Sequence, residues 1–228
     1  MIEVLILCGG FGTRLNKDKN KKNFLKPLVK INNEYLLKRI MKIYSSQAKC
    51  KFILLGGYNY HFLKKIIKKE FKEFSIQLIN TGLNTNTGGR IKFAEKFIKG
   101  KVFCLTYGDT LANFNLKSSL KLKSKKNLVI NIYKYFFQYG VIDLKNKYVK
   151  SFQEKKEFFI NAGFYILDKD IFEFIKSSKD SFENKTLPLI LKSKKKMIVN
   201  KLNKWKPVDT SKDKNDLEKI LLNKNDFF

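Results

Sequence analysis

Cysteine and histidine are scarce in this sequence. Its three cysteines, Cys8, Cys50 and Cys104, show no CxxC spacing, and an odd number cannot form a closed set of disulfides. Cys8 and Cys104 lie within apolar runs, so we expect them to be small buried side chains. The only histidine, His61, falls on a predicted helix, where we expect a packing or surface position and no catalytic role.

The sequence also lacks long hydrophobic runs. Stretches such as residues 4–8 are far shorter than the ~18–20 apolar residues that cross a bilayer, and no signal-peptide pattern opens the chain. We therefore expect a soluble, cytoplasmic protein with no membrane partner. Hydrophobic residues still make up 43% of the chain, with 21 Phe and 10 Tyr, which is enough for a sizeable core. A length of 228 residues fits one α/β domain better than two.

Acidic residues and arginines are few for a chain of this charge. Asp and Glu number 20 against 48 Lys and Arg, which gives a formal net charge of +28. Such a charge could serve nucleic-acid binding. However, only Arg14, Arg39 and Arg90 carry the guanidinium that favours base readout, and the lysines are spread along the whole chain. We therefore expect no nucleic-acid partner, although a positive field would attract anionic nucleotides and phosphates.

The first half of the chain alternates predicted strands and helices. Short apolar runs bounded by glycine are typical of buried strands, and apolar residues spaced i, i+3, i+4 are typical of amphipathic helices. This alternation predicts βαβ units in an α/β, Rossmann-like three-layer sandwich with a mixed, mainly parallel sheet. The expected strands are 2–8, 51–55, 76–79 and 102–107, and the expected helices are 34–44, 62–71 and 88–97.

The second half contains closely spaced strand patterns, which we expect to add antiparallel strands to the sheet. These strands are 128–135, 139–144, 148–153 and 158–167, and helical patterns follow at 171–175, 187–191 and 217–222. The lysine runs at 17–22, 121–126 and 192–196 are expected to be solvated loops or helix ends. No linker divides the chain, so we expect a single domain over residues 1–228.

A glycine-rich turn follows the first predicted strand, with the sequence LCGGFGTRL at 7–15 and Lys26-Pro27 beyond it. Glycines at the carboxyl end of a strand let backbone N–H groups approach a triphosphate, which Arg14 and Lys26 can neutralise. A plain strand-ending turn is the alternative. The two pieces in this order resemble the sugar-phosphate nucleotidylyltransferase family, whose signature pairs a GGxGTRL loop with a KP lysine. The resemblance implies nucleotide-binding roles for Leu7, Gly9, Gly10, Gly12, Thr13, Arg14 and Lys26.

A second glycine segment, TGLNTNTGGRI at 81–91, opens a predicted helix. Glycines there can expose helical amides to an anion or let a flat base lie against the backbone, although helix entry alone would also explain them. The segment resembles the glucose-1-phosphate cytidylyltransferase branch of the family. The resemblance implies CTP as the nucleotide, with Thr87, Gly88 and Gly89 in its binding site.

Two aspartates form the candidate metal site. Asp109 ends a predicted core strand, and Asp209 lies in the segment WKPVDT near the C-terminus. Each alone would more often be a cap or turn residue. Carboxylate oxygens suit Mg²⁺, which needs only one or two of them. The order of the two segments resembles the family pattern, which implies that Asp109 and Asp209 hold Mg²⁺ and that Asp109 also contacts the nucleotide.

Three later segments, YGVID at 139–143, FQEK at 152–155 and NAGF at 161–164, resemble the family segments FG(A/V)xD, FQEKP and NGGF. As isolated residues they would be strand surface. The resemblance implies that the acceptor is bound by Gly140, Glu154, Lys155, Asn161 and Gly163. Departures are concentrated on this side: Lys156 replaces a proline and Ala162 a glycine. Elsewhere, Thr110 stands where glycine is common, and the link at 71–75 is shorter than in the cytidylyltransferase branch.

The resemblance spans residues 2 to about 222. It implies transfer of a nucleotidyl group from CTP to a sugar 1-phosphate such as glucose 1-phosphate, as in cell-surface polysaccharide biosynthesis, with Arg14, Lys26, Asp109 and Asp209 as catalytic residues. Residues 1–127 would bind the nucleotide and 128–228 the acceptor. A non-sugar acceptor, such as a phospho-amino acid or phosphocholine, remains an alternative. So does an inactive relative that binds nucleotides or nucleic acid. We also expect that the chain can form a homo-oligomer.

Overall fold

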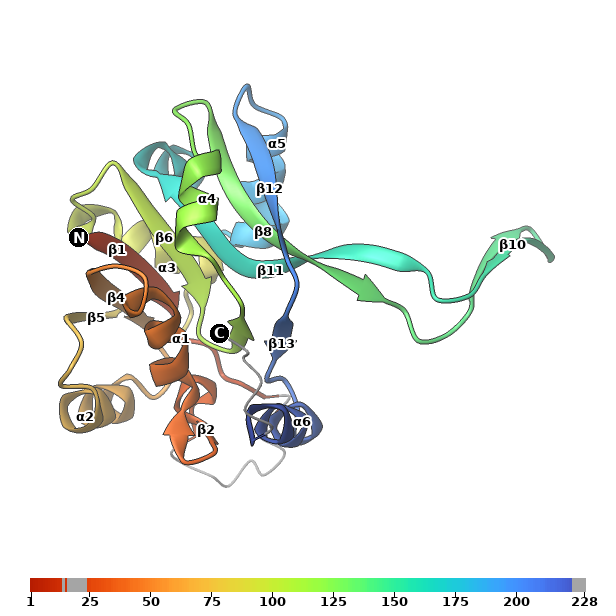
Figure 1. Ribbon diagram of the computed structural model, residues 1–228. Coiled ribbons are helices and arrows are strands. Elements are labelled where there is room, and N and C mark those ends of the chain that lie inside the picture. The colour runs from red at the N-terminus through yellow and green to blue at the C-terminus, as the bar shows by residue number, and fades with distance from the viewer. Residues whose placement is uncertain (14, 16–23, 223–228) are drawn as a thin grey trace.

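The computed structural model describes residues 1–13, 15 and 24–222. Its centre is a seven-stranded sheet with the strand order β12-β8-β11-β6-β1-β4-β5 (Figure 1). Six strands run in one direction, and β11 runs antiparallel to its neighbours β6 and β8. The sheet strands are β1 (Ile2–Leu7), β4 (Cys50–Gly56), β5 (Ile76–Asn80), β6 (Val102–Tyr107), β8 (Asn127–Phe136), β11 (Glu157–Asp168) and β12 (Lys196–Leu202). The expected mixed, mainly parallel sheet is confirmed.

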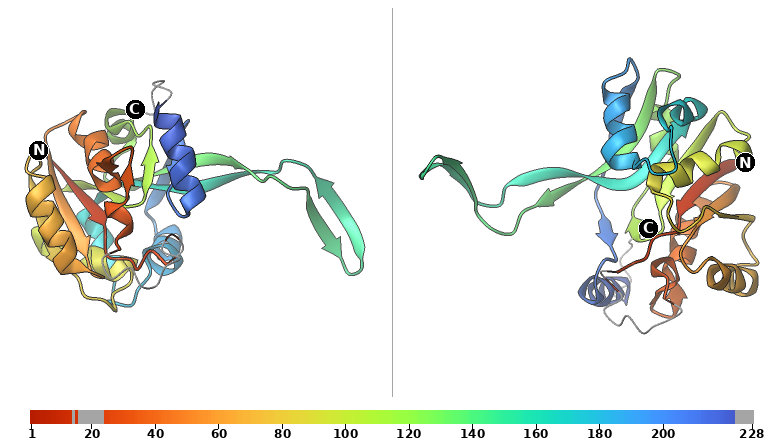
Figure 2. Two further views of the ribbon diagram at one scale, coloured as in Figure 1. Left: turned by 90° about the horizontal axis from the view of Figure 1, so that it is seen from below. Right: turned by 180° about the vertical axis from the view of Figure 1, so that it is seen from behind.

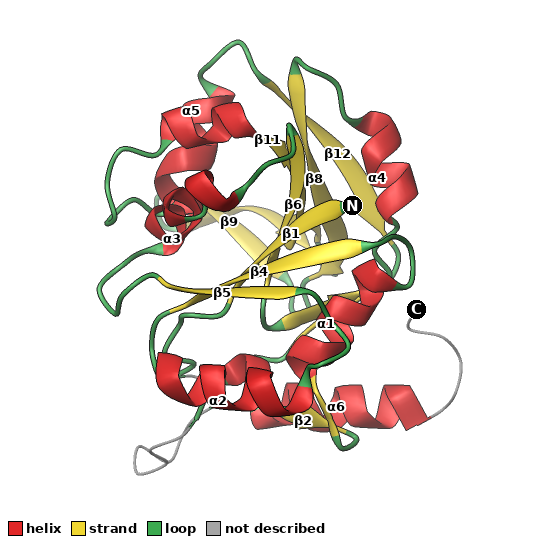
Figure 3. Cartoon of the chain, turned by 90° about the vertical axis from the view of Figure 1, so that its left-hand side faces the viewer, coloured by secondary structure: helices red, strands yellow, loops and turns green. Residues whose placement is uncertain are grey.

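Helices cover both faces of this sheet (Figure 3). One face packs against α1, α2, α4 and α6, and the other packs against α3, α5 and a 3₁₀ helix. The helices are α1 (Leu36–Ser45), α2 (Tyr60–Glu70), α3 (Thr87–Phe93), α4 (Leu116–Leu122), α5 (Leu187–Leu191) and α6 (Ser211–Leu222), with 3₁₀ helices at Lys26–Leu28, Glu95–Phe97 and Lys169–Phe174 and a π-helical turn at Phe182–Thr186. The chain is therefore the expected three-layer α/β sandwich.

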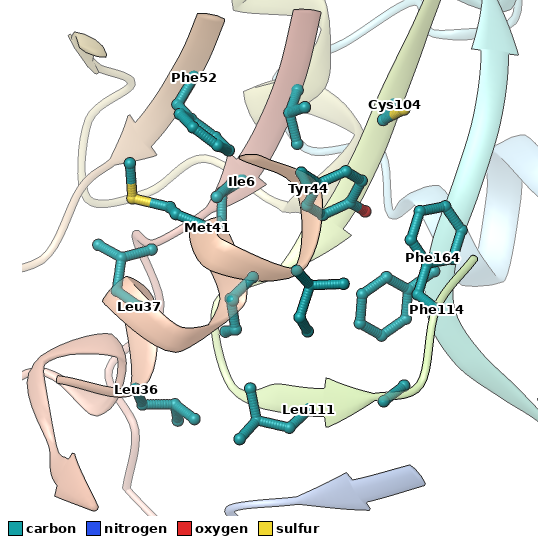
Figure 4. Close-up of a cluster of buried hydrophobic side chains, with 14 of the residues drawn as sticks. Ile6, Leu36, Leu37, Met41, Tyr44, Phe52, Cys104, Leu111, Phe114 and Phe164 are labelled. Carbon is teal, nitrogen blue, oxygen red and sulfur yellow. The ribbon is translucent and has the colours of Figure 1, made fainter. Parts of the chain in front are cut away.

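Strand β1 shows why the apolar runs lie between two layers. Val4 and Ile6 point into the core on the α1 side, and Leu5 points into the core on the α3 side. Tyr44 of helix α1 lies in the core on the α1 side of the sheet (Figure 4). The centroid of its ring is 5.1 Å from that of Phe114 and 6.3 Å from that of Phe164. Side chains buried on both faces of a strand remove its polar alternation, which is the pattern that the sequence shows.

The strands of the second half depart from the expectation. Strands β8 and β11 join the sheet, whereas β9 (Val141–Lys145) and β10 (Tyr148–Gln153) pair only with each other in a separate two-stranded sheet. This hairpin lies at the end of an arm that projects from the body (Figures 1 and 2). Two further small sheets pair β2 (Lys30–Ile31) with β3 (Glu34–Tyr35), and β7 (Thr110–Ala112) with β13 (Trp205–Pro207).

Two of the three lysine runs are not simply solvated. Lys123 and Lys195 are only 5% and 8% exposed, because they form ion pairs with Asp168, and Lys195 also pairs with Asp170. Lys196 begins strand β12, which the sequence pattern missed. The expectation of solvated loops or helix ends was therefore wrong about solvation at Lys123 and Lys195, since paired lysines can be buried, and wrong about secondary structure at Lys196. The run at 17–22 lies outside the described residues.

The expected burial of Cys8 and Cys104 is confirmed. Cys8, Cys50 and Cys104 are all free and buried, and burial raises the pKa of the Cys50 thiol to about 11. His61 is exposed on α2. Within the described part of the chain, no helix is long and apolar enough to span a membrane.

Candidate active site

A cleft of about 960 Å³ lies where the parallel strands β1 and β6 end. Ligands of open α/β sheets bind at this carboxyl edge, because the loops that follow neighbouring strands meet there. Ten of the predicted site residues line the cleft: Leu7, Gly9, Gly10, Gly12, Thr13, Lys26, Thr87, Asp109, Asn161 and Asp209. Arg14, predicted to bind the nucleotide and to act in catalysis, lies outside the described residues.

Lys26 is the central cation of this cleft. Its Nζ donates to Asp109 Oδ2 at 2.7 Å and to Asp209 Oδ1. Burial disfavours the ammonium charge, but the two carboxylates outweigh that effect and raise the pKa of Lys26 above its ordinary value. Lys26 therefore remains charged at physiological pH and stands ready to pair with phosphate oxygens.

Long-range strand pairing brings the two aspartates together. Asp109 lies two residues after the end of β6, and Asp209 lies two residues after the end of β13. Because β13 pairs antiparallel with β7, the Val208 N–H donates to the Asp109 carbonyl at 2.9 Å, which holds both side chains at the same edge. The two carboxylates converge on one cation position, now filled by Lys26.

This donor set fits Mg²⁺, which accepts one or two protein carboxylates and takes its other ligands from phosphates and water. Among the described residues, no group of three or more His, Cys, Asp or Glu could hold a metal ion. The described part of the chain therefore contains no site that would bind a metal mainly through protein ligands. A site in which Asp109 and Asp209 share the metal with substrate phosphates fits these residues better.

Arg90 ties together three loops at the glycine-rich end of the cleft, and sequence reasoning gave it no role. This buried guanidinium donates to the Gly56 carbonyl at 3.2 Å and to the Gly82 carbonyl at 2.9 Å. A Cβ on Gly9 or Gly57 would lie within 2.3 Å of it, so the guanidinium needs glycine in the loops after β1 and β4. Glycines at several strand ends are the signal that could have revealed this close approach.

The glycines that open α3 serve packing. A Cβ on Gly88 would lie 2.7 Å from the Asp180 carbonyl, and one on Gly89 would lie 2.2 Å from the Ser178 carbonyl. The Gly89 N–H already donates to Asp180 O at 3.2 Å. The structure therefore places Gly88 and Gly89 behind the cleft wall, where they let another loop approach α3, whereas Thr87 lines the cleft.

Glu183 is a cleft residue that sequence reasoning missed, because it lies on an irregular π-helical turn with no periodic signal. Its carboxylate accepts hydrogen bonds from Tyr107 Oη at 2.6 Å, Thr87 Oγ1 at 2.6 Å and Ser181 Oγ at 3.0 Å. Burial, together with Tyr165 and Glu183, raises the pKa of Tyr107 well above its ordinary value. The phenol therefore keeps its proton and remains a donor.

The predicted acceptor residues divide into two groups. Asn161 lines the cleft, where its Oδ1 accepts from the Gly163 N–H at 2.9 Å. Gly163 adopts a φ of 78°, and a Cβ there would lie 2.5 Å from the Tyr107 ring. Gly140, Glu154 and Lys155 instead flank the β9–β10 hairpin and do not line the cleft. The hairpin itself lies at the end of the projecting arm (Figure 2).

Comparison with known proteins decides the family. A nucleotidyl transferase family model matches residues 3–222. The chain belongs to this family. A probable glucose-1-phosphate cytidylyltransferase of Bacillus subtilis is 30% identical over 96% of both chains. A D-glycero-α-D-manno-heptose 1-phosphate guanylyltransferase of Campylobacter jejuni is 37% identical over 80% of this chain and 83% of its own.

The fold of this nucleotidyltransferase is also that of a solved relative. The crystal structure of HddC from Yersinia pseudotuberculosis is 27% identical, covers 97% of this chain and all of its own, and has a TM-score of 0.78. A second HddC structure is a complex with GMP-PN. Together these similarities identify the chain as a sugar-phosphate nucleotidyltransferase.

Proposed function

We propose that this nucleotidyltransferase joins the α-phosphate of GTP to the phosphate of a sugar 1-phosphate. The observation that carries the reaction class is the cluster of Lys26, Asp109 and Asp209 beside the glycine-rich loop. Support for GTP comes from the guanylyltransferase, which is 37% identical over 80% of this chain, and from the related HddC structure that binds GMP-PN. The short link between α2 and β5, residues 71–75, also departs from the cytidylyltransferase branch.

CTP is the second candidate nucleotide. It is favoured by the segment 81–91, whose sequence resembles the cytidylyltransferase branch, and by cytidylyltransferase relatives that match nearly the full chain. Leu83, Asn84 and Thr85 of this segment line the cleft, so they are the candidates for contact with the base. Glucose 1-phosphate would be the matching acceptor, and a heptose 1-phosphate would match GTP.

In the proposed reaction, an acceptor phosphate oxygen attacks the α-phosphorus of the nucleotide. The bond from that phosphorus to the oxygen bridging the β-phosphate breaks, and pyrophosphate leaves. The acceptor phosphate is already ionised, so no strong general base is needed, and alignment and charge neutralisation supply the catalysis. Lys26, together with Arg14, would neutralise the departing pyrophosphate. Asp109 and Asp209 would hold Mg²⁺, which supplies further positive charge to the phosphates when bound.

The test is pyrophosphate release over a matrix of four nucleotides and several phosphorylated acceptors. We expect GTP with a heptose or mannose 1-phosphate to give the highest kcat/KM. Higher turnover of CTP with glucose 1-phosphate would establish the second candidate. Turnover only with phosphocholine or a phospho-amino acid would remove the sugar from the proposal, and a lack of turnover with every pair would contradict it.

A further inference from the structure

Five polar side chains form a continuous series of hydrogen bonds beside the cleft, called here the Glu183 network. Asn161 Nδ2 donates to Tyr165 Oη, which lies 3.1 Å from Tyr107 Oη. Tyr107 Oη donates to Glu183 Oε1 at 2.6 Å, and Thr87 Oγ1 donates to Glu183 Oε2 at 2.6 Å. Tyr165 is fully buried, and the other four residues line the cleft. The network therefore links Asn161, predicted to bind the acceptor, with Thr87, predicted to bind the nucleotide.

The tyrosine protons of the Glu183 network point toward its carboxylate. A carboxylate only accepts hydrogen bonds, so the Tyr107 hydroxyl gives its one proton to Glu183. Tyr165 must then donate to Tyr107, and a lone pair of the Tyr165 oxygen accepts from Asn161. Burial raises the pKa of both phenols well above the ordinary value, so each keeps its proton. The position of Glu183 thus determines which way both tyrosine hydroxyls point.

The same direction fixes the side-chain amide of Asn161. Its Nδ2 gives one N–H to Tyr165, and its Oδ1 accepts from the Gly163 N–H at 2.9 Å. A flipped amide would set an oxygen against the Tyr165 oxygen and N–H groups against the Gly163 N–H, so both hydrogen bonds would be lost. The observed orientation leaves one N–H of Nδ2 and one lone pair of Oδ1 for a ligand in the cleft.

The backbone around the network is shaped to hold it. Strand β11 shifts register against β8 within residues 161–164, and bulges of this kind re-aim side chains next to active sites. Gly163 lies in this bulge with a φ of 78°, and a Cβ there would lie 2.5 Å from the Tyr107 ring. Glycine therefore lets that ring pack against β11. At the other end of the network, Ser181 Oγ donates to Glu183 Oε2 at 3.0 Å and helps to hold the carboxylate in place.

We propose that Glu183 is a positioning residue for the acceptor, because its carboxylate orients the Asn161 amide through two tyrosine hydroxyls. The remaining N–H and lone pair of that amide form a donor and acceptor pair. Such a pair matches a sugar hydroxyl, because a hydroxyl both donates and accepts hydrogen bonds. This inference rests on the proposed function, since it assigns Asn161 to the sugar 1-phosphate.

Tyr165→Phe is the first test, because it breaks the network and keeps the ring. With the best substrate pair, we expect the KM for the sugar 1-phosphate to rise about 3–10-fold, the effect of one lost hydrogen bond, while the KM for the nucleotide stays unchanged. The matched control is Tyr44→Phe, since Tyr44 is equally buried and lies on the opposite face of the sheet. This control should leave both KM values unchanged. An unchanged KM for the sugar 1-phosphate in Tyr165→Phe would overturn the inference.

Variants of Glu183 test whether its carboxylate acts through the tyrosines. Glu183→Leu removes the oxygen that accepts from Tyr107, and we expect the KM for the sugar 1-phosphate to rise as it does in Tyr165→Phe. Glu183→Gln should restore most of this loss, because its amide oxygen can still accept from Tyr107. The double variant Glu183→Leu with Tyr165→Phe should be no worse than either single variant, since both changes break one network. Additive losses would show that the two residues act separately and would contradict the proposal.

The NMR signal of the Asn161 side-chain amide gives a readout that needs no turnover. In protein labelled with ¹⁵N-asparagine, this signal can be assigned by its loss in Asn161→Asp. We expect it to move in Tyr165→Phe and in Glu183→Leu but not in Tyr44→Phe. A signal that stays in place in the first two variants would show that Glu183 does not orient Asn161. If no substrate pair is turned over, the proposed function fails, whereas this signal still decides whether the network acts on the amide.

Discussion

The glycine-rich end of the cleft and the residues predicted to bind the acceptor are built by different means. At the glycine-rich end, the loops that follow neighbouring parallel strands meet at one edge of the sheet, where Arg90 and Lys26 tie them together. Of the residues predicted to bind the acceptor, Asn161 lies on β11 and lines the cleft, while Glu154 and Lys155 lie beyond the sheet on a projecting arm. Parallel topology thus brings loops together at one edge of the sheet, whereas an antiparallel extension carries its residues away from that edge.

We expect the largest effect on activity from Asp109→Asn, which tests the glycine-rich end of the cleft. The change removes one of the two carboxylates that converge on the cation position of the cleft, so we expect kcat/KM to fall about 10²–10³-fold. The side chain is 34% exposed and lies outside the core, so the thermal midpoint should change little. Pyrophosphate release and thermal unfolding measure the two effects. Asp216→Asn on α6 is the control, and equal losses in both variants would argue against a special role for Asp109.

The fold was largely predictable from local pattern. The strand predicted at 102–107 is β6 with the same bounds, because an apolar run that ends in Gly-Asp is typical of a buried parallel strand. Strand β12 was missed because it is an edge strand, where an apolar run of only three residues, 197–199, is flanked by lysines and an asparagine. The arm was missed because period-two alternation predicts strands without saying which sheet they join.

The site was predictable where it follows the parallel sheet. Asp109 could be placed at a strand end from its neighbours, whereas Asp209 rested on the family resemblance, because its pairing through β13 spans half the chain. Arg90 and Glu183 escaped prediction as site residues because most of their partners lie far away in the sequence, and only the tertiary contacts reveal them.

A smaller effect is expected from Arg90→Lys, which tests whether the contacts of Arg90 hold together the loops at the glycine-rich end of the cleft. A lysine cannot reproduce the fork of the guanidinium, so the buried carbonyl of Gly56 and the carbonyl of Gly82 would each lose a donor. We expect the free energy of unfolding to fall by about 2–4 kcal/mol and the KM for the nucleotide to rise. Arg39→Lys is the matched control and should cost less, since Arg39 makes one hydrogen bond, from Nη2 to the Ile31 carbonyl, and an ion pair with Glu34 that a lysine could keep. Urea titration would contradict the proposal if the two variants were equally stable.

Gly163→Ala on strand β11 should lower the free energy of unfolding by less than Arg90→Lys does. Its φ of 78° is strained for alanine, and the new Cβ would press on the Tyr107 ring, so we expect a loss of about 1–3 kcal/mol in unfolding free energy. Gly10→Ala in the glycine-rich loop is the control variant, because no atom lies within 4 Å of the position that its Cβ would occupy. Its stability should change by less than about 0.5 kcal/mol, with only nucleotide binding weakened. An equal loss of stability in both variants would contradict this difference.

We expect the smallest effect from raising the pH. This experiment tests whether Lys26 is held between Asp109 and Asp209, as the contacts indicate. Burial opposes the charge, but Asp109 and Asp209 raise the pKa of Lys26 above its ordinary value of 10.5. A group whose folded pKa is raised contributes stability that is fully present below the unfolded pKa and is lost only as pH rises through the folded pKa. The thermal midpoint and the nucleotide KM should therefore show no loss due to Lys26 between neutral pH and about pH 9. A decline in that window in the wild-type protein, absent from Lys26→Met, would mean that Lys26 loses its proton early and is not held between the two carboxylates.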